Sequence, residues 1–289
     1  MRRRLPFGVA WVGGFLLALA LNAAGPKSGF FTTSDGVRLH YLEAGSGPSL
    51  VFVPGWTFPA EIWAPQLEHF ARGYHVIAVD PRSQGRSEKP SEGHYPHRRS
   101  RDYKELVDQL KLAPAVLVGW SLGVREVLAY VDQFGTGTLR GIVLVDGSPG
   151  GGYSSEILAR QLPMLEEMQR DRRGATEKYI RSTYKRPQPE SYYRRIIEAA
   201  LKTPTNTAIT LAANAWFSWD LRPVLARVDC PVLYVVSPQW RSITESVRAQ
   251  LPSARVEIFE QAGHALFVDE PARFNSLLDD FLRSMPQPR

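Results

Sequence analysis

The sequence contains almost no cysteine, and this excludes two kinds of structure. Cys230 is the only cysteine among the 289 residues, so the chain forms no internal disulfide and no multi-cysteine metal site. Repeats of fixed period and low-complexity tracts are also missing. The chain is long enough to bury one large core or two modest ones, and its hydrophobic content of 44% is ordinary for a globular protein.

Strong positive charge is missing as well, which argues against a nucleic-acid partner. The formal net charge is +6, and Arg2, Arg3 and Arg4 supply three of these charges. The remainder is too small to form the basic footprint of a nucleic-acid-binding surface. The sequence also lacks a glycine-rich dinucleotide fingerprint, and its histidines are not clustered at metal-ligand spacing. We therefore predict no cofactor and no metal.

Residues 1–24 have the layout of an export signal. Three arginines precede an apolar run over residues 5–21, and the small residues Ala23 and Ala24 follow it. We expect cleavage near Ala24 and a periplasmic or secreted protein. Two alternatives stay open: an uncleaved anchor, because the run is marginally long enough to span a bilayer, and a buried N-terminal helix. Any membrane contact is expected through this segment only.

The next part of the chain alternates between strand-like and helical segments. Asp35-Gly36 separates two strand-like runs, which is a hairpin signal. Further apolar strand-like runs lie at 49–53, 75–79, 115–119 and 141–145, and helical spacing occurs at 61–71, around 103–110 and at 122–130. Continuous apolar runs that alternate with helices predict an α/β fold with a mostly parallel sheet and helices on both faces.

This alternation is interrupted between residues 149 and 217. We find no apolar strand run there, and the amphipathic segments have helical spacing. The sheet pattern resumes afterwards, with strand-like runs at 231–236 and 255–259 and helical spacing near 243–251 and at 271–283. We therefore predict one α/β core, formed by residues 25–148 and 218–289, with a helical lid inserted at 149–217.

Ser121 lies between a strand-like run and a helical segment, in the sequence Gly119-Trp120-Ser121-Leu122-Gly123. Gly-x-Ser-x-Gly in this position predicts a strained turn that lifts the serine hydroxyl above the sheet. The glycines are needed because strand and helix backbones approach closely there. The Leu122 N–H, at the start of the helix, is then placed to stabilise an oxyanion. We predict that Ser121 is a nucleophile.

A nucleophilic serine needs a base, and His264 is the best candidate. It follows the last strand-like run and precedes the final helix, at the edge of the sheet where open α/β folds bind ligands. The other histidines lie in strand-like runs, on a helix face or in a polar loop, where we expect structural roles: His40, His69, His75, His94 and His97.

Several of these segments together resemble the α/β-hydrolase superfamily. "FVPGW" (52–56) resembles its oxyanion loop, "DPRSQGRS" (80–87) a conserved turn in which Ser83 replaces the first glycine, "GWSLG" (119–123) its nucleophile elbow, and "QAGH" (261–264) its catalytic-histidine loop. "PGW" with "GWSLG" is similar to the carboxylesterase branch. The resemblance covers nearly everything after residue 28.

The resemblance also implies a second oxyanion donor. The Trp56 N–H would stand beside the Leu122 N–H. Here Pro54 occupies a position where a histidine is usual, but the donor is a backbone group, so the replacement should not abolish it. The replacement instead changes how the loop is held.

The carboxylate that should orient His264 is missing from its usual place. In most of the family an aspartate follows the strand that here reads "PVLYVV", but this chain continues "SPQWRSITE", with Trp240 near the expected position. Asp146 ends the preceding strand, and some branches of the superfamily carry the acid there. We expect Asp146 to be the acid, while Glu245 and the absence of any acid stay open.

These features predict a serine hydrolase that cleaves a small-molecule carboxylic ester. Ser121 would attack the acyl carbon, His264 would take its proton and Asp146 would orient His264. A serine nucleophile argues against the aspartate-based displacement of halides and the opening of epoxides. Two alternatives stay open: acyl transfer to peroxide or another acceptor with the same triad, and a ligand-binding protein with weak turnover, which the vacant acid position favours.

Overall fold

The computed structural model describes residues 25–150, 155–217 and 220–286. The predicted export signal at residues 1–24 lies outside these ranges and stays a prediction. Across the described residues, no helix combines the length and the apolar character needed to cross a membrane.

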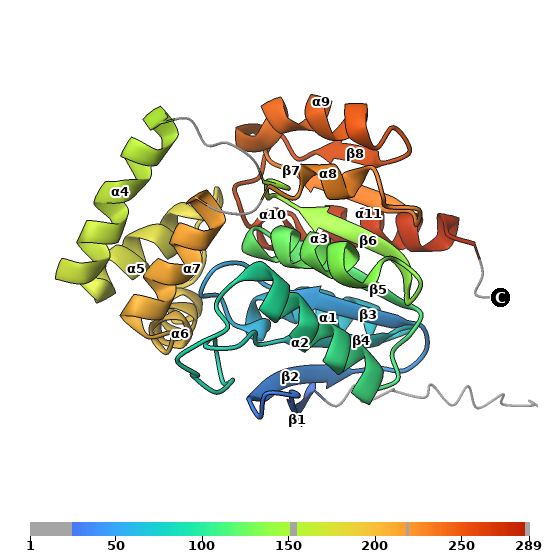
Figure 1. Ribbon diagram of the computed structural model, residues 1–289, viewed down its shortest axis with the longest axis horizontal. Helices are drawn as coiled ribbons and strands as arrows, with labels where there is room; N and C mark the ends of the chain where they lie inside the picture. Colours follow the sequence, from blue (N-terminus) through green and yellow to red (C-terminus); the bar gives the residue numbers. More distant parts are fainter. Residues whose placement is uncertain (1–24, 151–154, 218–219, 287–289) are drawn as a thin grey trace, which may run out of the picture.

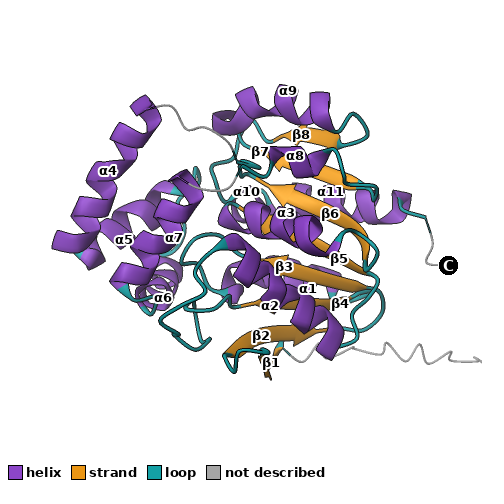
Figure 2. Cartoon of the chain, in the orientation of Figure 1, coloured by secondary structure: helices purple, strands orange, loops and turns teal. Residues whose placement is uncertain are grey.

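Within the described residues, an eight-stranded sheet forms the centre of the fold (Figures 1 and 2). Its strands are β1 (Lys27–Thr32), β2 (Arg38–Ala44), β3 (Ser49–Val53), β4 (His75–Val79), β5 (Ala115–Trp120), β6 (Leu139–Val145), β7 (Val232–Val236) and β8 (Arg255–Ile258). Their order is β1-β2-β4-β3-β5-β6-β7-β8. Strands β3 to β8 are parallel, and the predicted hairpin joins β1 to β2 in antiparallel pairing. The predicted mostly parallel sheet is confirmed.

Helices cover both faces of this sheet. One face carries α1 (Ala64–Phe70) and α11 (Pro271–Ser284), and the other carries α2 (Pro96–Gln109), α3 (Leu122–Phe134), α8 (Arg222–Leu225) and α9 (Arg241–Gln250). Shorter helical turns are η1 (Ala60–Trp63), η2 (Pro238–Trp240) and α10 (Leu266–Asp269). The helix predicted at 61–71 is thus divided into η1 and α1. The division falls at Ala64, where α1 begins with Pro65 in its first turn, because proline fits the first turn of a helix and not its interior.

A helical insert follows β6 and precedes β7. It consists of α4 (Ser155–Arg170), α5 (Arg172–Ser182), α6 (Glu190–Leu201) and α7 (Thr205–Phe217). Figure 1 shows these helices grouped beside the carboxyl ends of the central strands. The insert therefore lies where a substrate would enter an open α/β sheet. That it acts as a movable lid stays a prediction.

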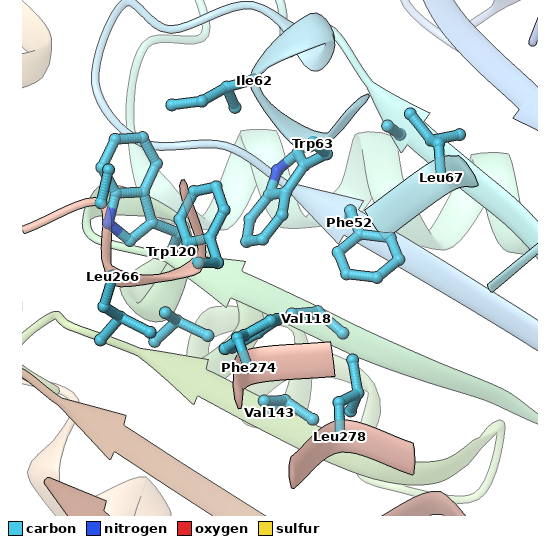
Figure 3. Close-up of a cluster of buried hydrophobic side chains, with 14 of the residues drawn as sticks. Phe52, Ile62, Trp63, Leu67, Val118, Trp120, Val143, Leu266, Phe274 and Leu278 are labelled. Carbon is cyan, nitrogen blue, oxygen red and sulfur yellow. The ribbon is translucent and has the colours of Figure 1, made fainter. Parts of the chain in front are cut away.

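The core between the sheet and helices α1 and α11 is rich in aromatic side chains (Figure 3). The rings of Trp63 and Phe267 stack with their centroids 3.8 Å apart, and Trp120 packs edge-on against Phe267 at 5.2 Å. Both tryptophans are completely buried. Trp120 immediately precedes the predicted nucleophile, so this aromatic core fixes the end of β5 that carries Ser121.

The connection from β5 to α3 has no room for a side chain at Gly119. A Cβ atom there would lie 2.4 Å from the carbonyl oxygen of Gly123 and 2.8 Å from a methyl group of Val127. The first of these neighbours is backbone and cannot rotate away. The close approach predicted from the two glycines of the elbow is therefore present.

We expect Gly119→Ala to lower the free energy of unfolding by about 1–3 kcal/mol, the usual range for overpacking a buried site. Equilibrium urea unfolding measures the change. The matched control is Gly137→Ala, since a Cβ at Gly137 meets no atom within 4 Å. Equal stability of the two variants would show that β5 and α3 are not packed as closely as described.

Candidate active site

Ser121 occupies the turn between β5 and α3 in a rare backbone conformation, with φ 56° and ψ −114°. For a residue other than glycine such a conformation costs on the order of 1–3 kcal/mol and is maintained only by the surrounding structure. Two backbone bonds maintain it here: the Ser121 N–H donates to Val145 O at 2.9 Å, and its carbonyl accepts from Val124 N at 3.0 Å. The predicted strain at this turn is present.

His264 lies between Ser121 and Asp146 and contacts both. Its Nε2 atom is 2.8 Å from Ser121 Oγ, and its Nδ1 atom is 2.7 Å from Asp146 Oδ2. The indole N–H of Trp120 donates to the His264 carbonyl oxygen at 2.9 Å and holds the histidine loop against β5. The structure thus brings together all three side chains that the sequence analysis selected.

Asp146 is fully buried at the end of β6 and accepts hydrogen bonds from several donors. Its Oδ2 atom accepts from Ser237 Oγ at 3.0 Å and Gln239 Nε2 at 2.9 Å, besides the contact with His264. Its Oδ1 atom accepts from the Ser237 N–H. These donors replace the hydration that a buried carboxylate loses. Glu245, the alternative acid, is exposed on α9.

Ser237 and Gln239 are site residues that the sequence analysis did not identify. They follow β7, where the family resemblance led us to look for an aspartate. Gln239 Nε2 also lies 3.2 Å from His264 Nδ1, so its amide touches both members of the His–Asp pair. The sequence offered one signal for them, which is that two polar residues stand at the vacant acid position. Their hydrogen-bond partner, Asp146, lies 91 or 93 residues away along the chain.

Ser121 and His264 open into a cavity of about 270 Å³ between the sheet edge and the helical insert. Trp56 and Leu122, the predicted oxyanion donors, line the same cavity. Leu122 is the first residue of α3. A Cβ atom at Gly55 would lie 3.0 Å from Ser121 Cβ, so the loop that carries Trp56 passes directly beside Ser121. Both predicted donors are therefore next to Ser121.

The cavity wall is largely apolar or neutral. Besides the residues already named, it consists of Arg125, Gly147, Ser148, Met164, Tyr179, Ser182, Thr183, Ala212, Ala215 and Trp240. Burial raises the pKa of the Tyr179 hydroxyl above its usual value, so this group stays neutral over the physiological range. Arg125 of α3 also lines the cavity and adds a positive charge to its wall.

The other five histidines pair with side chains outside the cavity. The partners are Asp80 for His40, Asp279 for His69, Glu43 for His75, Ser83 for His94 and Asp132 for His97. Burial, with nearby arginines, lowers the pKa of His94 to about 4, so it is neutral at pH 7. In the part of the chain that the structure describes, no group of three His, Cys, Asp or Glu side chains is placed to hold a metal ion.

The fold and the serine at the strand–helix turn define an α/β hydrolase. The sequence profile of the alpha/beta hydrolase family matches residues 50–277, and the chain belongs to this family. The predicted superfamily is thereby confirmed.

Relatives include non-heme haloperoxidases and a putative synthase. The chain is 37% identical to a non-heme chloroperoxidase of Streptomyces lividans over 139 residues, which cover 47% of this chain and 50% of that protein. The match therefore spans about half the length of this relative. A putative 2-succinyl-6-hydroxy-2,4-cyclohexadiene-1-carboxylate synthase of Bacillus subtilis is 28% identical over 88% of this chain and 98% of its own.

Solved structures share the fold over almost their whole length. An esterase from Exiguobacterium antarcticum superposes with a TM-score of 0.82 at 22% identity, covering 88% of this chain and 99% of that one. A bromoperoxidase from Bacillus anthracis gives 0.83 at 21% identity, covering 89% and 100%. At these identities the likeness establishes the fold alone.

We expect Asp146→Asn to reduce catalytic turnover by about 100-fold or more. The amide would offer a donor where His264 Nδ1–H needs an acceptor, which favours the wrong imidazole tautomer. Part of the lost activity should return at high pH, where hydroxide assists. Steady-state kinetics across pH measures both effects.

Glu245→Gln is the matched control and should keep the wild-type turnover, since Glu245 is exposed on α9. Near-normal turnover of Asp146→Asn together with an inactive Glu245→Gln would mean that the acid is Glu245. Activity in both variants would mean that His264 works without a carboxylate.

Proposed function

We propose that the protein is a serine hydrolase that cleaves carboxylic esters through an acyl-enzyme. The observation that carries this proposal is the continuous line of contacts from Ser121 through His264 to Asp146, at 2.8 and 2.7 Å. A serine hydroxyl is a weak nucleophile unless a base removes its proton, and this line supplies the base together with the group that orients it.

The reaction proceeds in two halves. Ser121 Oγ attacks the acyl carbon while its proton moves to His264 Nε2, and the imidazolium that forms is stabilised by Asp146. The N–H groups of Leu122 and Trp56 hold the negative oxygen of the tetrahedral intermediate. When the intermediate collapses, His264 returns the proton to the departing alcohol. A water molecule, deprotonated by His264, then attacks the acyl-enzyme and releases the acid and Ser121.

The cavity favours a small substrate. Its volume of about 270 Å³ is just below the range of about 300–1,000 Å³ typical of pockets for drug-sized ligands. Its walls come from both the core and the insert, and they are mostly apolar. A short acyl group fits such a space next to Ser121.

Ser121→Ala should abolish the hydrolysis of p-nitrophenyl acetate while leaving the fold intact. Removing a serine nucleophile costs on the order of 10⁶ in turnover in a well-studied protease. Release of p-nitrophenol measures activity, and circular dichroism checks the fold. A fluorophosphonate probe should label the wild type rapidly and the variant not at all. Retained turnover would contradict the assignment, and a wild type that labels very slowly would favour the ligand-binding alternative.

Acyl transfer to peroxide is a second candidate, and the relatives favour it. One relative is named a bifunctional esterase/perhydrolase, from Acinetobacter calcoaceticus, 33% identical over 42% of this chain and 45% of its own. In such a reaction hydrogen peroxide replaces water: its oxygen attacks the acyl-enzyme, His264 takes its proton, and a peracid and free Ser121 result. The same triad serves both outcomes.

The two candidate functions differ in which molecule attacks the acyl-enzyme, water or hydrogen peroxide. With p-nitrophenyl acetate and millimolar hydrogen peroxide, a perhydrolase should form peracetic acid, which oxidises bromide and brominates a dye indicator. After subtraction of the reaction that peroxide and ester give without enzyme, we expect bromination to be lost in Ser121→Ala, because the enzymatic peracid arises from the acyl-enzyme. Bromination that persists in this variant would contradict acyl transfer at Ser121, and its absence in the wild type would leave hydrolysis as the function.

A further inference from the structure

A tight turn directly after β3 carries the Trp56 N–H. The turn runs from Gly55 to Phe58 and is closed by a bond from Phe58 N to Gly55 O at 3.2 Å. Thr57, inside the turn, has φ 62°, which is unfavourable for a β-branched residue. A turn that holds such a residue depends on contacts from outside to keep its shape.

One side chain, that of Gln84, holds both ends of this turn. Its Nε2 atom donates to Gly55 O at 3.0 Å and to Phe58 O at 2.8 Å. Gln84 is completely buried in the loop after β4. Both amide hydrogens are therefore used, and both bonds go to the backbone of the turn.

The orientation of this amide is fixed by its partners. Its Oε1 atom accepts a hydrogen bond from an Arg99 amino group at 2.8 Å, and carbonyl oxygens accept from its nitrogen. A reversed amide would place oxygen against two carbonyl oxygens and nitrogen against a guanidinium. Arg99 is fixed in turn by a buried ion pair with Glu126 of α3 at 2.6 Å, and Glu126 accepts from the Tyr103 hydroxyl.

This arrangement determines where the Trp56 N–H points. Gly55 C=O and Trp56 N–H belong to the same planar peptide group, in which the two bonds point in opposite directions. With the carbonyl oxygen fixed on Gln84, the N–H is directed away from Gln84. Trp56 lines the cavity with Ser121, and a Cβ atom at Gly55 would lie 3.0 Å from Ser121 Cβ, so the Gly55–Trp56 peptide borders the serine.

We propose that Gln84 is a positioning residue for the oxyanion hole. By binding Gly55 O and Phe58 O, it holds the Gly55–Trp56 peptide so that the Trp56 N–H meets the developing oxyanion, and Arg99 and Glu126 hold Gln84. The inference rests on the proposed function, in which Trp56 is an oxyanion donor. It also accounts for how this loop is held with Pro54 at its start, since proline offers no side-chain hydrogen bond and no N–H donor.

Gln84→Met tests the inference, because methionine has a similar length and no amide. An oxyanion donor contributes about 10²–10³ in turnover, so a donor that is present but poorly aimed should cost about 10- to 100-fold. An interaction made only in the transition state lowers kcat and kcat/KM equally and leaves KM unchanged. Kinetics with p-nitrophenyl acetate measures this. Binding of a boronic acid, whose tetrahedral adduct with Ser121 occupies the oxyanion hole, should weaken by a similar factor.

Two further variants separate positioning from a general loss of structure. Gln84→Glu keeps the shape but places an oxygen against the two carbonyl oxygens, so its turnover should fall at least as far as that of Gln84→Met. Gln133→Met is the matched control. Gln133 lies near the C-terminal end of α3, and its Nε2 atom also donates to a backbone carbonyl, that of His97, at 2.7 Å. It should lose stability in urea without losing turnover or boronate affinity.

The outcomes distinguish the inference from the function on which it rests. If the wild type neither hydrolyses esters nor reacts with a fluorophosphonate at Ser121, the proposed function fails and the inference fails with it. If the wild type reacts and both folded Gln84 variants keep its kcat and boronate affinity, the inference alone is wrong. A rise in KM at constant kcat would also overturn it, because the loss would then concern substrate binding.

Discussion

Trp120 makes the contact on which the geometry of the site depends. Its indole is buried in the aromatic core next to β5, and its N–H donates to the carbonyl oxygen of His264. Ser121 follows Trp120 directly in the chain, so one side chain ties the serine turn to the histidine loop. Because β5, β6, β7 and β8 are parallel neighbours, the loops after them meet at one edge, and this bond sets the spacing between two of them.

The sequence was sufficient to predict the fold and to select three side chains that lie in contact, because each has a local signal. Ser121 lies between close-packed glycines, His264 follows the last strand, and Asp146 ends a strand whose neighbour lacks an aspartate. Gln84 and Gln239 have no such signal. The backbone partners of Gln84 lie 26–29 residues away, and the partners of Gln239 lie 25–93 residues away. An amide in a loop gives no indication of which of these distant groups it will meet. The break between η1 and α1 was missed for a simpler reason: helical spacing continues across Pro65.

At two positions the chain departs from the family pattern, and at each a glutamine side chain makes hydrogen bonds nearby. Where an acid was expected after β7, Ser237 and Gln239 donate to the acid that stands after β6. Where a histidine is usual in the oxyanion loop, Pro54 stands, and a glutamine from the next loop holds that turn. In both cases a neutral side chain supports a functional group from a neighbouring strand end. These supporting side chains therefore add no charge of their own beside Asp146 and Ser121.

The helical insert is hydrogen-bonded to the loops on both sides of Ser121. The Trp56 indole N–H donates to Ala208 O of α7 at 2.7 Å, and the Ala265 N–H, next to His264, donates to Thr183 O after α5 at 3.1 Å. The insert is thus held to the core loops by hydrogen bonds at two points. Both acceptors are backbone carbonyls, so a chimera that received the corresponding helices of a relative would keep the two bonds only if its own carbonyls occupied the same positions. Redesign of this segment therefore has to preserve its alignment with the two core loops.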